Sequence, residues 1–271
     1  MLSRYHEAPL CIFDEVQKRT DGDYALVHLF ETDEFYYSKF EQAVRKGRDV
    51  ILDNSLFELH ESGRKFDAKK FINWVDTLKP RYYIVPDSWR NGPETIRMFK
   101  DFIETYPRPI EGRIGVAQGK TFAEVAATYE QLEPYCEVIA FNFDFSDFWY
   151  SSNYGKKETN ISDRQAMTLG RMLMMHYLDA HKVINHEKKH HLLGCGVPQE
   201  IRCTEHFPWI TSIDTCHPIM TGMTGYRYSE EGFNPKCEFK MCDHMHDELS
   251  EHQKQLIWHN LSVIENWLKE E

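Results

Sequence analysis

The chain has 271 residues, of which 41% are hydrophobic and 14% are aromatic, and its formal net charge at pH 7 is −11. This length and apolar content are enough for the core of one large domain, and they exclude a globally disordered chain. The negative charge disfavours a sequence-blind nucleic-acid binder, which is normally basic, although an enzyme with a local basic patch remains compatible with it.

Seven short apolar runs along the chain are predicted to be strands. They are rich in β-branched or aromatic residues, and most of them lack the strict alternation of half-exposed strands, as buried parallel strands do. An eighth strand is expected either near the N-terminus or after residue 224. The seven predicted strands cover residues 24–30, 50–53, 82–86, 113–117, 138–143, 191–195 and 209–214.

Amphipathic segments with helix start signals lie between these runs. Capping residues and a proline in a first helical turn mark where helices are expected to begin. A last helix is predicted over residues 247–268, where apolar residues follow helical spacing. The predicted start signals are Asp67, Pro93, Thr121 with Glu124, and Ser162 with Gln165.

This alternation of strands and helices predicts a parallel sheet with right-handed crossovers. A single (β/α)₈ barrel, the TIM-barrel fold, fits residues 1–271, because such barrels need roughly 250 residues. We expect an insertion at about residues 146–190 and a C-terminal helix at about 247–268. No Gly-x-Gly-x-x-Gly follows the first strand, so an open dinucleotide-binding sheet has no local support.

Most of the predicted strands end on a residue suited to catalysis or recognition. In an α/β barrel these ends converge on one face, where the active site is built. An aspartate after a strand is more often the N-cap of the next helix, and this alternative stays open for Asp87. It fits Asp53 and Asp214 less well, because no helical pattern follows them at once. The strand-end residues are Asp53 with Asn54, Asp87, Gln118 with Gly119, Asn142, and Asp214.

Several carboxylates at a barrel mouth suit two kinds of chemistry. Without a metal, one aspartate can attack an anomeric carbon while another moves protons. With a metal, the same residues could be ligands of a hydrolase centre. The residues alone leave both kinds of chemistry open.

Three segments resemble the core of the queuine tRNA-ribosyltransferases, also called tRNA-guanine transglycosylases. They are ILDNSLFEL at residues 51–59, LLGCGVPQEI at 192–201 and SIDTCHPIMTGMTGYRY at 212–228. In that family a Leu-Met-Gly-Val-Gly-Lys-Pro run precedes a strand that ends in the nucleophilic aspartate, and an earlier strand ends in Asp-Ser-Gly-Gly. The resemblance implies that Asp214 is the nucleophile and that Asp53 is the general acid/base.

Two further segments are similar to base-binding motifs of the same family and occur in the same order. YIVPDS at residues 83–88 resembles the strand that delivers the aspartate binding the incoming base, and GVAQGKT at 115–121 resembles Gly-Ile-Val-Gln-Gly-Gly, whose glutamine contacts the base. The resemblance therefore implies base-binding roles for Asp87 and Gln118. The expected substrate-binding residues are Asp87, Gln118, Gly119, Asn142 and Asn54.

The departures from the tRNA enzymes point to one branch of the superfamily. The Cys-x-Cys-x-x-Cys zinc module is absent, and AFNFDF at residues 140–145 stands where the family has Gly-Gly-Leu-Ala-Val-Gly. The chain looks more like the deoxypurine-in-DNA protein A family, phage and bacterial relatives that exchange guanine in DNA for a 7-deazaguanine. The resemblance implies a queuosine-related pentosyltransferase in which Asp214 attacks C1′, guanine leaves, and Asp53 handles the proton of the incoming base. No cofactor is required for this chemistry.

A cluster of possible metal ligands follows the last motif. Cys237, Cys242, His244 and His246 form a Cys-x₄-Cys-x-His-x-His pattern. Clustered thiols and imidazoles can hold zinc tetrahedrally, and the cluster could be a reworked form of the missing module. Its spacing is not specific to zinc, so a structural zinc site is one reading and a metal-free loop is the other.

Two other groups of residues allow either a purely structural interpretation or a functional one. The basic turn at residues 186–191, which carries His186, His190 and His191 with Lys188 and Lys189, is either a solvated loop or a contact to nucleic-acid phosphate. The aromatic residues at 143–150 either pack on the barrel or stack on a base flipped out of its helix.

Composition also bears on localisation and on the alternatives to base exchange in DNA. No stretch approaches the roughly 20 apolar residues of a membrane span, and the first ten residues lack the apolar run of a signal peptide. Seven cysteines without disulfide spacing predict reduced thiols. We therefore expect a soluble cytoplasmic protein, in the host cytoplasm if a phage encodes it. Base exchange in tRNA, a metal-dependent hydrolase and a non-catalytic partner subunit are the competing hypotheses, and the oligomeric state stays open.

Overall fold

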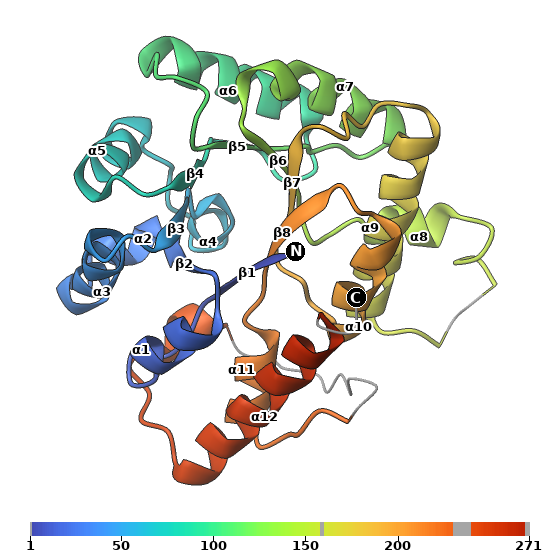
Figure 1. Ribbon diagram of the computed structural model, residues 1–271. Coiled ribbons are helices and arrows are strands. Elements are labelled where there is room, and N and C mark those ends of the chain that lie inside the picture. The colour runs from blue at the N-terminus through green and yellow to red at the C-terminus, as the bar shows by residue number, and fades with distance from the viewer. Residues whose placement is uncertain (1, 158–159, 230–239, 269–271) are drawn as a thin grey trace.

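The computed structural model describes residues 2–157, 160–229 and 240–268 and contains a closed barrel of eight parallel strands. The strands follow one another around the barrel in chain order, and the helices surround them (Figure 1). The predicted (β/α)₈ TIM barrel is therefore confirmed. The strands are β1 (Ser3–His6), β2 (Gly22–Leu26), β3 (Asp49–Asp53), β4 (Tyr82–Ile84), β5 (Arg113–Val116), β6 (Val138–Phe141), β7 (Lys189–Leu192) and β8 (Ile210–Asp214).

The eighth strand is the N-terminal one, which settles the alternative that the sequence leaves open. β1 pairs with β8 on one side and with β2 on the other, so it closes the barrel. In this register Tyr5 lies opposite Asp214, and the chain leaves β1 at the same end of the barrel as that aspartate.

The helices form the outer layer. The longest are α9 and α12, and their packing against the barrel builds the main core of buried apolar side chains. A second, smaller apolar cluster fills the barrel interior below the strand ends. The helices are α1 (Phe13–Val16), α2 (Val27–Phe30), α3 (Glu34–Arg45), α4 (Leu56–Glu61), α5 (Ala68–Leu78), α6 (Gly92–Thr105), α7 (Phe122–Leu132), α8 (Ser146–Ser151), α9 (Asp163–Ala180), α10 (Pro198–Cys203), α11 (His217–Met223) and α12 (Glu251–Trp267).

Several predicted boundaries differ from the structure. The strand predicted over residues 191–195 is Lys189–Leu192, and the last helix begins at Glu251 instead of residue 247. Two further differences concern the kind of element. The strand expected over residues 24–30 ends at Leu26, and its second half is the short helix α2, because a short apolar run does not distinguish a strand from a buried helical turn. The insertion expected at residues 146–190 contains α9, which is the regular crossover helix between β6 and β7. Among the described residues of this range, α8 is the helix that is additional to the barrel pattern.

The predicted capping signals are largely confirmed. The Asp67 side chain accepts hydrogen bonds from the backbone of the first turn of α5, and Ser162 with Gln165 forms a reciprocal capping box on α9. Thr121 caps α7, but the carboxylate of Glu124 accepts from the backbone of the preceding residue instead of completing the box. Asn91 caps α6, so the strand-end residue Asp87 is not used as that cap. Within the described residues, no helix combines the length and the apolar character needed to span a membrane.

Candidate active site

A cavity of about 610 Å³ opens at the C-terminal ends of the barrel strands. We call it the mouth cavity, and its volume lies in the usual range for small-molecule sites. Every strand contributes to it at or just after its C-terminal end, so it is the place where this fold normally builds an active site. The contributing residues are Glu7, Leu26, Asp53, Asp87, Gln118, Asn142, Gly194 and Asp214.

The Asp214 carboxylate, at the end of β8, is held by two groups of the neighbouring strand β7 and its loop. Oδ1 lies 2.9 Å from Nε2 of His191, and the backbone N–H of Gly194 donates to both carboxylate oxygens at 3.1 Å. Gly194 has a φ of +58°, a left-handed conformation that other residues seldom adopt. The glycine of the LLGCG motif is therefore needed to turn its N–H toward Asp214.

The Asp53 carboxylate lies at the end of β3, where the chain makes a tight turn. Ser55 is fully buried with a φ of 54°, and its backbone N–H donates to Oδ2 of Asp53 at 3.1 Å. Burial raises the pKa of Asp53 well above its ordinary value, and the nearby carboxyl groups of Glu58, Asp87 and Asp214 raise it further. Asp53 is therefore suited to carry a proton at neutral pH.

Side-chain amides surround the third aspartate of the mouth cavity. Asn54 donates to Oδ1 of Asp87 at 3.0 Å, and Gln118 donates to Oδ2 at 2.7 Å. Asn142 in turn donates to the amide oxygen of Gln118. Burial raises the pKa of Asp87, while the bonds from Asn54 and Gln118 act in the opposite direction. Four of the five predicted substrate-binding residues thus form one hydrogen-bonded network on a single wall.

Two further carboxyl groups line the mouth cavity and were not predicted from the sequence. Glu7 follows β1, and Glu58 lies in α4. Oε1 of Glu7 and Oε2 of Glu58 are buried and have no hydrogen-bond partner among the described residues. Burial raises the pKa of both carboxyl groups, and for Glu7 the carboxyl groups of Glu58, Asp214 and Asp53 add to the shift. The mouth cavity is therefore rich in carboxyl groups, and these surroundings favour the protonated, neutral form of Glu7, Glu58 and Asp53.

Three aromatic rings stand together at the mouth cavity. Phe57 makes edge-to-face contacts with Trp89 and with Phe143, at centroid distances of 6.0 and 5.6 Å. Trp89 is 47% exposed, so part of its ring is open to a ligand. Of the aromatic segment at residues 143–150, Phe145 and Phe148 instead pack in the core. Of the two interpretations of this segment, packing on the barrel is thus the correct one for Phe145 and Phe148.

A buried ion pair supports the wall between β6 and β7. Arg171 in α9 and Glu200 in α10 are both inaccessible to solvent, and a guanidinium nitrogen lies 2.6 Å from the Glu200 carboxylate. Arg171 also donates to the backbone carbonyls of Phe141, Asn142 and Leu193, which end the two strands. The helix that was expected in an insertion therefore fixes the strand ends on which Asn142 and Gly194 depend.

Gly119 does not line the mouth cavity, although its neighbour Gln118 does. A side chain at Gly119 would meet the backbone of Val125 at 2.7 Å, so the glycine is required for packing against α7. The structure thus gives Gly119 a packing role, and its expected role in substrate binding stays a prediction.

The predicted zinc cluster receives no support from the residues described. Cys237 lies outside them, and the remainder of the described chain brings no three His, Cys, Asp or Glu side chains together as metal ligands. His244 instead pairs with Asp247 at 2.7 Å and His246 with Asp33 at 2.6 Å. Cys242 is half-buried, and burial raises the pKa of its thiol to about 12.

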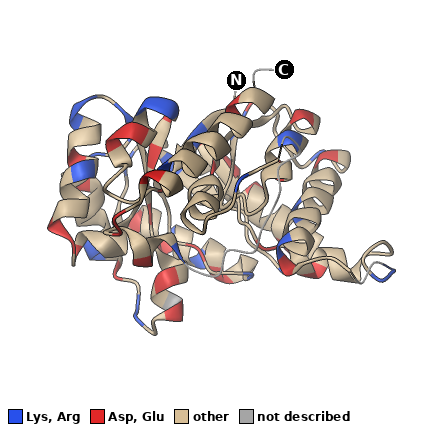
Figure 2. Ribbon diagram, turned by 90° about the horizontal axis from the view of Figure 1, so that it is seen from below, with Lys and Arg blue, Asp and Glu red and all other residues tan. Residues whose placement is uncertain are grey.

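The part of the basic turn that carries His186, Lys188 and Lys189 lies at the opposite end of the barrel from the mouth cavity, since these residues enter β7 there. His191 lies farther along the strand, beside Asp214. Lys188 and Lys189 pair with Glu133 and Glu137, and His186 pairs with Asp179. A contact of this turn to phosphate at the mouth is therefore excluded by position. Figure 2 shows that Lys and Arg are interspersed with Asp and Glu around the helices instead of gathering on one side.

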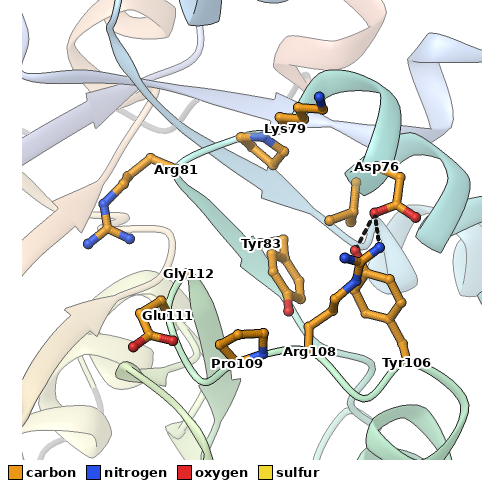
Figure 3. Close-up of a pocket in the computed structure, with 11 residues that line it drawn as sticks. Asp76, Lys79, Arg81, Tyr83, Tyr106, Arg108, Pro109, Glu111 and Gly112 are labelled. Atoms are coloured by element: carbon orange, nitrogen blue, oxygen red, sulfur yellow. Dashed lines mark hydrogen bonds and ion pairs between the residues drawn. The ribbon is translucent and has the colours of Figure 1, made fainter.

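A second, more open cavity of about 820 Å³ lies among residues that precede β4 and β5, at the end opposite the mouth cavity (Figure 3). Several of its charged side chains already have partners. Asp76 accepts hydrogen bonds from Tyr106 at 2.6 Å and from Arg108 at 3.1 Å, and Arg81 donates to Glu137 at 2.9 Å. The mouth cavity is the better candidate, because it combines buried carboxyl groups with polar atoms that lack partners.

Comparison with known proteins adds little beyond the fold. No known protein family and no curated protein matches the chain in sequence. Among solved structures, it is similar to N-(5'-phosphoribosyl)anthranilate isomerase from Pyrococcus furiosus, with a TM-score of 0.45 and 8% identity over 98% of this chain and 99% of that one. A likeness at this level says nothing about the reaction, because such barrels carry many unrelated activities.

Proposed function

We propose that this protein is a base-exchange transglycosylase that replaces guanine in DNA by a 7-deazaguanine through a covalent aspartyl-glycosyl intermediate. The observation that carries the proposal is the mouth cavity, which Asp214 and Asp53 line together with the Asp87 amide network. The two carboxyl groups sit in different surroundings, since Asp214 is held by donors whereas burial and neighbouring carboxyls keep the proton on Asp53. One nucleophile and one proton carrier are what exchange at an anomeric carbon requires.

The proposed reaction has two symmetric halves. In the first, Asp214 forms a bond to C1′ while the bond from C1′ to N9 breaks, and the departing guanine takes the proton of Asp53. In the second, N9 of the 7-deazaguanine gives its proton to Asp53 and attacks C1′, and the electron pair of the ester bond returns to Asp214. Two displacements at one carbon retain the configuration of the sugar.

Base recognition would fall to the wall beside the turn that carries Asp53, where Asp87 lies between two amides. Each carboxylate oxygen has two lone pairs, so each can accept from a base N–H in addition to its present bond. The N1–H and N2–H groups of guanine and of 7-deazaguanines are two parallel donors that match a carboxylate. Phe57, Phe143 and the half-exposed Trp89 offer ring faces for stacking a base that has left its helix.

DNA is our preferred polymer because the resemblance is to relatives that lack the zinc module of the tRNA enzymes. Base exchange in tRNA remains the runner-up. Incubation of the protein with labelled guanine and either duplex DNA or tRNA distinguishes them, since label is expected to enter DNA. Label that enters tRNA but never DNA would contradict the preference while leaving base exchange intact.

The same assay tests the chemistry when it is combined with trapping of the intermediate. A covalent adduct that maps to Asp214, absent from D214N and present in the control D49N, is the expected result, because Asp49 is exposed at the far end of β3. Absence of both exchange and adduct with either polymer would reject the proposal. A stoichiometric metal lost together with activity would favour the hydrolase alternative, and full activity of D214N within a complex would favour the partner-subunit alternative.

A further inference from the structure

We propose that His191 is a positioning residue that fixes the Asp214 carboxylate and leaves Oδ2 as the atom that attacks C1′. The inference rests on the proposed function, because it takes Asp214 as the nucleophile. It concerns a residue that the sequence places in the basic turn with the lysines. The structure instead buries its side chain completely inside the barrel.

A backbone irregularity brings the imidazole to the aspartate. His190 pairs with Ile210, but His191 pairs with Ser212, so β8 has one extra residue, Thr211, at this point. Bulges of this kind re-aim side chains and are frequent next to active sites. Because side chains alternate along a strand, Ser212 and Asp214 point to the same side, and the ring of His191 reaches both.

Both ring nitrogens of His191 are engaged. Nδ1 lies 2.8 Å from Oγ of Ser212, and Nε2 lies 2.9 Å from Oδ1 of Asp214. The ring also meets the edge of Tyr5 at a centroid distance of 6.0 Å and an interplanar angle of 74°. Two hydrogen bonds and a packed ring leave the imidazole little freedom to turn.

The partners also assign the proton on the ring. A carboxylate that acts as a nucleophile has only acceptors, so Nε2 must carry the hydrogen that is shared with Asp214. Nδ1 can then accept a hydrogen bond from the hydroxyl group of Ser212. The serine fixes the tautomer of His191, in the way that the partner of a second ring nitrogen commonly does.

The two oxygens of Asp214 differ as a result. Among the described residues, Oδ1 receives hydrogen bonds from His191 and Gly194, whereas Oδ2 receives only the one from Gly194. Oδ2 therefore has the lone pair available for C1′, and Oδ1 keeps its donor after the ester forms. When the carboxylate departs in the second half-reaction, the returning charge is stabilised by the bond from His191, which should speed turnover of the intermediate.

The test compares H191F, H191Q and the control H190F with the wild type. Phenylalanine keeps the ring but removes both nitrogens, whereas glutamine retains an N–H donor. His190, the neighbouring residue, contacts Tyr129 at 2.9 Å in the helical layer and not Asp214. All variants are first checked for a wild-type circular dichroism spectrum and a cooperative thermal transition.

H191F is expected to lower kcat about 100-fold, as removal of one donor to a reacting carboxylate typically does, while KM stays within roughly threefold. Its covalent adduct should persist longer than that of the wild type. H191Q should recover kcat to within about tenfold of the wild type, because it restores a donor. H190F should retain the wild-type kcat. Wild-type kcat in H191F, or a loss in H190F as large as in H191F, would overturn the proposal.

A second measurement does not depend on activity. In ¹⁵N-histidine spectra, the signal lost in H191F identifies His191, and it should show the tautomer protonated at Nε2 with a shift that changes in D214N. Protonation at Nδ1, or a spectrum insensitive to D214N, would reject the role of His191 even if base exchange is demonstrated. If the wild type exchanges no base but the spectra agree, the proposed function fails and the contact between the two residues stands.

Discussion

Gln118 donates a hydrogen bond of 2.7 Å to Oδ2 of Asp87, and Asn54 donates one of 3.0 Å to Oδ1, so this carboxylate lies between two amides that end neighbouring strands. Asn142 extends the chain of bonds by donating to Gln118. Such a network orients the carboxylate before a ligand arrives. It also fixes which lone pairs remain available to that ligand.

Asp87→Asn is expected to weaken binding of the base more than it slows chemistry. The amide loses the charge and one of two acceptors, and hydrogen bonds to a charged group contribute about 1.5–3 kcal/mol. KM for the free 7-deazaguanine should rise about 10- to 100-fold with kcat nearly unchanged, as measured by steady-state exchange kinetics. An unchanged KM would show that Asp87 does not contact the base.

Arg171 and Glu200 should be strongly coupled in stability. Both are fully buried, so Glu200→Gln leaves an unpaired buried cation and should lower the free energy of unfolding by about 3–5 kcal/mol. Arg171→Met leaves a buried carboxylate and three strand-end carbonyls without their donor. Urea denaturation of both single variants and of R171M/E200Q is expected to show that the double variant loses less than the sum. Additive losses would contradict the coupling.

Neutralising Glu7 should stabilise the protein in a pH-dependent way. Burial and nearby carboxyls raise the pKa of Glu7 in the folded state, so the stability present at low pH is lost as the pH rises through that folded pKa. Glu7→Gln avoids this loss and should increase the free energy of unfolding at pH 8 by about 1 kcal/mol, the usual size of a single-site effect.

Thermal unfolding of wild type and E7Q at pH 5 and pH 8 measures this difference. The gap between them should be small at pH 5 and larger at pH 8, and the contributions of buried histidines such as His6 cancel because both proteins contain them. The exposed Glu104 of α6 gives the control E104Q, which should show no such trend. A gap that shrinks as the pH rises would be incompatible with a raised pKa at Glu7.

The sequence alone predicts seven of the eight strands. It also predicts which polar residues stand at the strand ends, namely Asp53, Asp87, Gln118 and Asp214. These strands can be recognised in the sequence because buried parallel strands are short, continuous apolar runs. The sequence leaves the place of β1 open because its residues, Ser3–His6, are mostly polar by type, and they become buried only when the barrel closes against β8. Glu7 was missed for the same reason, since a strand-end residue is found only after its strand.

The role of His191 could not be predicted because it depends on a bulge. A period-two pattern assumes a regular ladder, and the one extra residue in β8 changes which side chains share a face. In sequence, His191 stands among basic residues that indicate a solvated turn, whereas the fold places it farther along β7, where its side chain is buried beside Asp214. Glu58 was missed because it lies in a helix, α4, that bends over the cavity from a turn containing the strained Ser55.

The pH dependence of the base-exchange rate should follow the ionisation of the Asp53 carboxyl group. Burial and the neighbouring carboxyls of Glu58, Asp87 and Asp214 raise its pKa well above the ordinary value, so the acid form persists toward neutral pH. The departing guanine needs that proton, so the rate should fall as the pH rises through the folded pKa of Asp53. Asp53→Asn cannot transfer a proton and should lower kcat by about 100- to 10,000-fold, the usual contribution of a general acid.

Exchange rates measured from pH 5 to pH 9 with wild type, D53N and the control D49N test this expectation. The wild type and D49N should share a falling limb on the alkaline side, and the residual activity of D53N should lack it. Because Glu58 contributes to the raised pKa, E58Q should move that limb to lower pH, since a neutral amide no longer opposes ionisation of Asp53. A limb that stays in place in E58Q, or that survives in D53N, would assign the titrating proton to another group.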